Sequence, residues 1–200
     1  GDDVGSNYFL YGYSETTGYL PASQLVMNAG YWLGLFAPAT LDVAGSAQVD
    51  TLAAPLAAPW QLVGTGLYKN LALDRTRVRH DGQTLLFADA VQAGWISPAV
   101  YGWDPGLRAY QPADTLEIWR GYWVGQLVDG VEMLFHKDWG YIPIGGLAAL
   151  PDPTVGWMVG FQASAANVTE QVYLGMNPAA TRGFDAPYDY PKPPVAPGGG

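Results

Sequence analysis

The chain has 200 residues, a net charge of −9 and 49% hydrophobic side chains. This length and hydrophobic content suffice for a buried core, and the acidic balance excludes nucleic acid as a partner, because binding its phosphates requires clustered Lys and Arg. Only 14% of the residues are charged, while Gly (26), Pro (16) and aromatic residues (14%) are frequent. This balance predicts strands and turns rather than helices.

The sequence lacks cysteine, a long apolar run and a signal peptide, and each absence excludes a type of site or segment. The chain has no cysteine, so disulfides, zinc–thiolate sites and thiol nucleophiles are excluded. No run of about 18 uninterrupted apolar residues occurs, so no membrane span is expected. The start, GDDVGSNYF, lacks the basic and apolar regions of a signal peptide. We therefore expect a processed chain or a piece of a longer protein.

The first predicted unit, residues 1–52, contains the pentapeptide GYWLG, and almost the same letters, GYWVG, return later in the chain. Residues 18–34, GYLPASQLVMNAGYWLG, and residues 109–125, AYQPADTLEIWRGYWVG, are identical at eight of 17 positions, with a constant offset of 121 − 30 = 91. Chance would give about one identity. The repeat predicts a β half-unit that is present twice.

The second predicted unit, residues 53–146, begins with an Ala/Pro-rich connector at 53–59 and a strand at Trp60. Asp81-Gly82 separates two alternating stretches, 75–80 and 83–87, and this pattern predicts a β-hairpin. Asp129-Gly130 predicts a second hairpin, between residues 122–128 and 131–135. The one helical candidate is FADAVQA at residues 87–93, which ends at a glycine.

The third predicted unit, residues 147–186, begins with a second connector at 147–153. Trp157 to Gly160, WMVG, is then similar to Trp60 to Gly64, WQLVG. We expect this partial unit to pair either with the first half-unit or with a neighbouring copy of the chain. Residues 187–200 are rich in Pro and Gly and predict a linker. The predicted fold is all-β, a β-sandwich built from the duplicated GYW half-unit.

The GYW motif predicts a packing role first. Successive side chains of a strand point to opposite faces, so of Tyr122 and Trp123 one ring packs inward and the other lies outward or under a loop. Outward rings would offer a flat platform on which a sugar could stack. The candidates for such a platform are Trp103, Tyr110, Trp119 and Tyr122.

No catalytic constellation is recognisable. Neither of the two histidines, His80 and His136, lies in an HExxH-like motif, and no GxSxG motif is present. We expect that the chain is not an enzyme and needs no cofactor. Calcium is the one metal that the sequence suggests, because Asp185 and Asp189 lie in turns where carboxylate and carbonyl oxygens can gather. The same two aspartates are also typical of Asx turns, in which the side chain forms a hydrogen bond to nearby backbone.

The motifs resemble a β-rich module that occurs in large secreted bacterial proteins. They are WQLVG at residues 60–64, GWISPAVYGWD at 94–104 and TLEIWRGYWV at 115–124. Residues 173–194 also look like the stretch that precedes type IX secretion C-terminal sorting domains. Ile118-Trp119 stands where such modules usually have a proline, and the sorting domain itself is missing. The resemblance implies a bacterial extracellular or cell-surface location and no particular reaction.

Three hypotheses follow. The first is a non-catalytic structural or adhesive module, whose partners are further copies or other surface proteins. In that case the partial unit of one copy could complete the first half-unit of the next, forming a filament, or both ends could close within one monomer. The alternative function is a carbohydrate-binding module that holds a polysaccharide on exposed Trp and Tyr rings.

Overall fold

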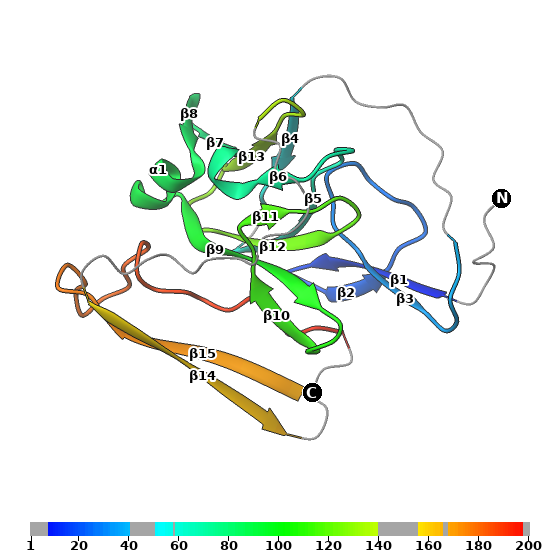
Figure 1. Ribbon diagram of the computed structural model, residues 1–200. Helices are drawn as coiled ribbons and strands as arrows, with labels where there is room; N and C mark the ends of the chain where they lie inside the picture. Colours follow the sequence, from blue (N-terminus) through cyan, green and yellow to red (C-terminus); the bar gives the residue numbers. More distant parts are fainter. Residues whose placement is uncertain (1–7, 41–50, 58, 140–155, 166–167, 198–200) are drawn as a thin grey trace.

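The computed structural model describes residues 8–40, 51–57, 59–139, 156–165 and 168–197 (Figure 1). Within them the chain forms antiparallel strands and one α-helix of six residues, so the predicted all-β fold is confirmed. The elements are β1 Tyr8–Ser14, β2 Gly18–Pro21, β3 Trp32–Leu35, β4 Leu52–Pro55, β5 Trp60–Gly64, β6 Leu71–Ala72, η1 Leu73–Arg75, β7 Arg77–His80, β8 Gln83–Leu86, α1 Phe87–Gln92, β9 Ile96–Asp104, β10 Ala109–Pro112, β11 Thr115–Leu116, β12 Gly121–Gln126, β13 Glu132–Phe135, β14 Trp157–Ala165 and β15 Val168–Met176.

A central sheet with strand order β10-β9-β12-β5 organises the molecule. A second four-stranded sheet has the order β4-β13-β7-β8, and a three-stranded sheet has the order β2-β1-β3. The pairs β11-β6 and β14-β15 complete the described strands. Figure 1 shows the three-stranded sheet and the β14–β15 hairpin in different places around the central sheet.

Both faces of the central sheet are covered, which explains why both rings of the second GYW motif are buried. Tyr122 faces the β4-β13-β7-β8 sheet in the larger hydrophobic core, together with Met133 and Phe135. Trp123 faces the other way, into a smaller core under Tyr13 of β1. The exposed fractions are 2% for Tyr122 and 1% for Trp123. The alternation of the two rings thus supplies one anchor to each layer.

The three-stranded sheet β2-β1-β3 and the strands β10-β9-β12 correspond closely. Their strand orders match, and so do the residues that face each other once the sequence offset is applied. The corresponding pairs are Tyr11↔Trp32 with Tyr101↔Trp123, Leu10↔Leu33 with Val100↔Val124, Tyr13↔Tyr19 with Trp103↔Tyr110, and Tyr11↔Pro21 with Tyr101↔Pro112. This is the arrangement that a duplicated half-unit predicts. The duplication and the sandwich architecture stay predictions.

The tyrosine of each GYW motif makes the same backbone contact. The Tyr31 hydroxyl accepts a hydrogen bond from the Val26 N–H at 2.7 Å, and the Tyr122 hydroxyl accepts one from the Glu117 N–H at 2.8 Å. Each donor lies five residues before its tyrosine. The Tyr122 ring also lies so close to Gly102 that an added Cβ would be 3.1 Å from it. The motif tyrosine therefore fixes the loop that precedes its own strand.

The first glycine of the GYW motif allows a close approach of two chain segments. The Gly30 N–H donates to the Leu62 carbonyl at 2.9 Å, which joins the segment before β3 to the outer edge of β5. A Cβ at Gly30 would lie 2.7 Å from Leu62 Cγ and 2.9 Å from the Val63 carbonyl oxygen. A Cβ at Gly121, the equivalent glycine, would lie no closer than 3.6 Å to any atom. The close approach of two chain segments therefore requires glycine at Gly30, in the first GYW motif, and not at Gly121 in the second.

Two local predictions agree with the structure, whereas one predicted hairpin does not. The Asp81-Gly82 turn joins β7 to β8, and α1 ends just before Gly94, as predicted. Asp129-Gly130 does not make a hairpin, because β12 belongs to the central sheet and β13 pairs with β4 and β7. The predicted connector at 53–59 begins within strand β4, which includes residues 53–55 and whose Ala54 is buried. The second predicted connector, 147–153, lies outside the described residues.

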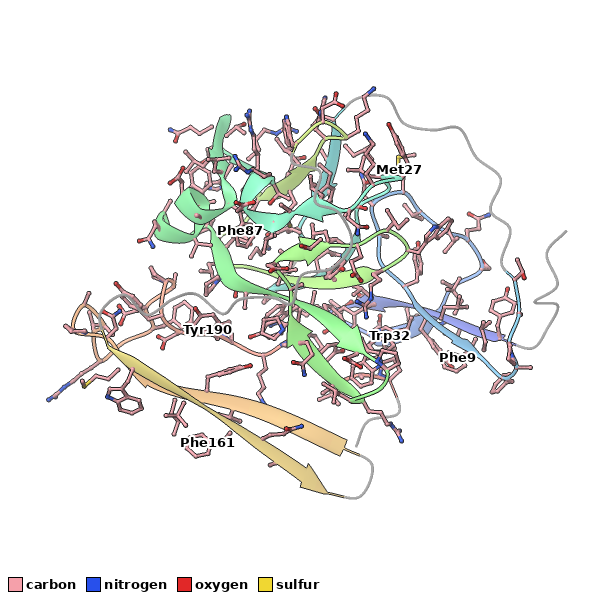
Figure 2. The ribbon with its side chains drawn as sticks, in the orientation of Figure 1. Phe9, Met27, Trp32, Phe87, Phe161 and Tyr190 are labelled. Atoms are coloured by element: carbon pink, nitrogen blue, oxygen red, sulfur yellow. The ribbon has the colours of Figure 1, made fainter. Side chains whose placement is uncertain are left out.

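The predicted C-terminal linker packs on the protein in its described part, residues 187–197. Tyr190 contacts the smaller core of Leu62, Tyr101 and Trp123, and Figure 2 shows its ring between β15 and the central sheet. The Tyr19 hydroxyl donates a 2.8 Å hydrogen bond to the Val195 carbonyl. This segment therefore covers part of the central sheet and reaches the three-stranded sheet, so the prediction of a free linker was wrong here.

Candidate interaction surfaces

The rings predicted to stack on sugars lie in three different environments. Tyr122 is buried, so its ring is not accessible to a sugar and this prediction is corrected. Trp103 and Tyr110 are partly buried in an aromatic cluster, where the Trp103 ring lies 5.0 Å from the Trp32 ring and 5.2 Å from the Tyr110 ring. Tyr110 is also held by a hydrogen bond from Trp123 Nε1 to its hydroxyl, at 3.0 Å. These two rings contribute mainly to packing.

Trp119 is the exception, with 80% of its surface exposed. Its backbone has a φ of 62°, in the left-handed region that is unfavourable for a bulky residue. The corresponding residue of the first half-unit is Asn28, at 119 − 91 = 28, and its φ is 64°. Asparagine tolerates this conformation better. Trp119 therefore combines an accessible aromatic face with an unfavourable backbone position, a combination found at ligand-contacting residues.

Replacing this tryptophan by the residue of the first half-unit should not weaken the fold. For Trp119→Asn we expect a free energy of unfolding that is unchanged or up to about 1 kcal/mol higher, because asparagine relieves the left-handed strain. Urea denaturation followed by circular dichroism measures the change. A loss of more than about 1 kcal/mol would show that the ring stabilises the folded chain.

The β14–β15 hairpin has one apolar face that is open to solvent. Residues that face each other across an antiparallel pair lie on the same side of the ladder. Three such pairs on one side are Trp157↔Met176, Val159↔Leu174 and Phe161↔Val172. All six side chains are between 44% and 57% exposed. Figure 2 shows Phe161 pointing away from the central sheet. Contiguous apolar patches of this kind, on the order of several hundred Å², are typical of interaction sites.

The opposite side of the hairpin faces the protein. Tyr173 lies on that side, since it is paired with Gly160. Burial raises the pKa of the Tyr101 hydroxyl in β9, with a smaller contribution from the neighbouring Tyr173 hydroxyl. The hairpin is thus attached to the central sheet through its polar side and presents its apolar side outward. The alternation of apolar residues in WMVGF and VYLGM was a sequence signal for this surface.

A second apolar surface lies on the three-stranded sheet. Tyr8, Leu20, Leu33 and Leu35 share the face that points away from Trp123, and each is between 40% and 49% exposed. The residues that correspond to Leu10 and Leu33 in the central sheet are Val100 and Val124, and both are fully buried. The first half-unit thus leaves open a face that the second half-unit buries.

The predicted calcium ligands are engaged in turns. Asp185 Oδ1 accepts a hydrogen bond from the Thr181 hydroxyl at 3.1 Å, and its other carboxylate oxygen accepts the Thr181 N–H. Asp189 Oδ2 accepts the Asp185 N–H at 2.6 Å. In the described part of the chain, no group of three or more acidic or histidine side chains comes together. Calcium binding stays a prediction.

The two histidines have structural neighbours. The His80 ring lies 5.2 Å from the Trp95 ring, and its Nε2 is 3.5 Å from Asp81. The His136 ring stacks on Trp139 at 5.1 Å, and its Nδ1 accepts the Asp138 N–H. Both rings are therefore packed on aromatic neighbours. That the chain is not an enzyme stays a prediction.

Alkaline pH should destabilise the aromatic layers. Burial raises the pKa of the hydroxyls of Tyr19, Tyr110, Tyr122 and Tyr190 above the ordinary value of 10. A tyrosine whose pKa is raised by folding stabilises the fold fully below pH 10, and this stabilisation is lost as the pH rises through the raised pKa. We expect the melting temperature to be flat between pH 8 and 9.5 and to fall above pH 10. Thermal melts at each pH test this, and a constant melting temperature up to pH 11.5 would contradict it.

Comparison with known proteins adds no relative. No family model matches the chain, and neither the curated proteins nor the solved structures contain a match. The resemblance to GYW-motif modules of secreted bacterial proteins therefore stays a prediction. Among the described residues, no helix is long and apolar enough to span a membrane.

Proposed function

We propose that this chain is a non-catalytic structural or adhesive module of the bacterial cell surface or extracellular space, which associates with further copies of itself through exposed apolar surfaces. The observation that carries the proposal is the open apolar face of the β14–β15 hairpin, with six large side chains about half exposed. The open face of the three-stranded sheet is a second surface of the same chemistry. The location rests on the sequence resemblance alone.

The experiment compares three variants by size-exclusion chromatography with light scattering. Val159→Lys and Leu174→Lys place a charge on the apolar face of the hairpin, whereas Gln162→Lys places the same charge at an exposed position on the opposite side. Because a charge in an apolar interface is unpaired and costly, the first two variants should be monomeric. The unmodified chain and Gln162→Lys should form larger species. Equal behaviour of all four chains would refute the proposal.

Carbohydrate binding is the second candidate, favoured by the exposed ring of Trp119. Arg120, the next residue in the chain, forms a partly exposed ion pair with Glu117 at an N···O distance of 2.6 Å. Aromatic faces flanked by polar groups suit a sugar ring. A panel of insoluble polysaccharides should retain the unmodified chain and lose Trp119→Asn. If no polysaccharide retains either chain, this candidate is rejected.

A further inference from the structure

The strand β3 lacks the neighbour that its counterpart has. In the central sheet, β12 pairs on one side with β9 and on the other with β5. In the three-stranded sheet, β3 corresponds to β12 and pairs with β1, but it has no second partner among the described strands. Its outer edge thus presents N–H and C=O groups that can pair with another strand.

A strand of the required type is present elsewhere in the chain. The neighbour of β12 is β5, with the sequence WQLVG, and β14 begins with the similar sequence WMVG. Within the described residues, β14 pairs with β15 and with no other strand. In Figure 1 β14 is the outer strand of the hairpin and lies apart from β3, so the two edges do not meet within one molecule.

We propose that β14 of one copy pairs antiparallel with the free edge of β3 in a second copy. This inference rests on the proposed function and names the two strands that meet. The contact joins two different surfaces, and each copy keeps one of them free. Repetition therefore builds an open chain of molecules rather than a closed dimer.

The pairing of β12 with β5 defines the expected register. Gly125 faces Trp60 and Trp123 faces Leu62. The offset in residue number is 125 − 34 = 91 between β12 and β3, and 157 − 60 = 97 between β14 and β5. When the β12–β5 register is applied to β3 and β14 with these offsets, Gly34 faces Trp157 and Trp32 faces Val159. Leu33 then faces Met158.

The side chains in this register are compatible. The Trp60 ring packs over Gly125, where an added Cβ would be 3.4 Å from Cη2. Gly34 is the equivalent glycine, and it is covered by the Phe9 ring, which is itself 38% exposed. Trp157 would therefore pack against the outer side of Phe9, and Val159 beside Trp32. A shift by one residue would place the apolar residues of β14 on the other face of the sheet.

Cysteine cross-linking tests the register directly, because the natural chain contains no cysteine. The variant Leu33→Cys/Met158→Cys should form a ladder of covalent oligomers on a non-reducing gel after mild oxidation, since facing residues of antiparallel strands lie within disulfide reach. The control Leu33→Cys/Val159→Cys should form none. Mixing the two single variants, Leu33→Cys and Met158→Cys, should give a mixed dimer that contains one of each. Circular dichroism confirms that every variant is folded.

The outcomes separate this inference from the proposed function. A ladder from the control alone, or only intramolecular disulfides, overturns the register. If the unmodified chain assembles and Leu33→Cys/Met158→Cys gives no ladder, pairing of β3 with β14 is refuted while association through the hairpin stands. If the unmodified chain remains monomeric at every concentration, both are refuted.

Discussion

Replacing Trp123 by alanine is expected to remove a large part of the stability of this protein. Trp123 is 1% exposed, its ring lies 4.7 Å from the Tyr13 ring, and its Nε1 donates to the Tyr110 hydroxyl. Truncation of a buried tryptophan costs about 3–5 kcal/mol, while the whole fold of a domain is stable by about 5–15 kcal/mol. The three-stranded sheet, which packs on this ring, should loosen first. Urea denaturation and hydrogen exchange measure the two effects.

A matched control separates burial from the loss of an aromatic residue. Trp119→Ala removes the same ring from the surface, and the expected change in the free energy of unfolding is less than about 0.5 kcal/mol. Should Trp123→Ala cost less than about 1 kcal/mol, the smaller core would not hold the three-stranded sheet to the central one. The GYW tryptophan would then not act as an anchor between the two layers.

The two GYW glycines should differ in their sensitivity to substitution. We expect Gly30→Ala to cost about 1–3 kcal/mol, because its Cβ would be 2.9 Å from the Val63 carbonyl oxygen, a backbone atom that cannot move freely. Gly121→Ala meets no atom closer than 3.6 Å. Its stability should be unchanged or slightly higher, since alanine reduces the entropy of the unfolded chain. Thermal melts of the two variants provide the comparison.

The reverse order of these two effects would contradict the structure. A larger loss of stability for Gly121→Ala than for Gly30→Ala would mean that the segment before β3 packs closely against β12 rather than against β5. Equal losses would mean that the two motifs have the same surroundings. The comparison therefore tests the placement of the first half-unit on the central sheet.

Features encoded by neighbouring residues could be predicted from the sequence. The Asp81-Gly82 hairpin and the helix at Phe87–Gln92 depend on turn residues and on a glycine that follows at once. The opposite orientation of Tyr122 and Trp123 follows from the period of a strand. The offset between the GYW motifs also predicted two sets of strands of similar sequence, and these have matching registers.

Features that depend on distant parts of the chain could not be predicted in this way. The turn at Asp129-Gly130 looks like a hairpin locally, yet the partners of β13 are β4 and β7. Tyr122 is buried because the β4-β13-β7-β8 sheet covers it. Tyr190 lies in a proline-rich stretch, but large aromatic surfaces are available for it to cover. In each case the choice of partner was decided by tertiary packing.

Trp119 shows how a comparison within one chain can identify a functional candidate. Its exposure alone would be unremarkable, since single apolar residues are common on protein surfaces. The equivalent position holds Asn28, whose side chain donates a 2.8 Å hydrogen bond to the Ala53 carbonyl. The first half-unit thus uses this position for an internal contact, whereas the second exposes an aromatic ring there.

Sedimentation velocity of the unmodified chain over a wide concentration range tests the central claim of self-association most directly. We predict that the weight-average sedimentation coefficient rises steadily with concentration and has no upper limit at a dimer, because the contact between β14 and β3 is open-ended. A single species with the mass of one chain, 21.4 kDa, at every concentration would contradict the account.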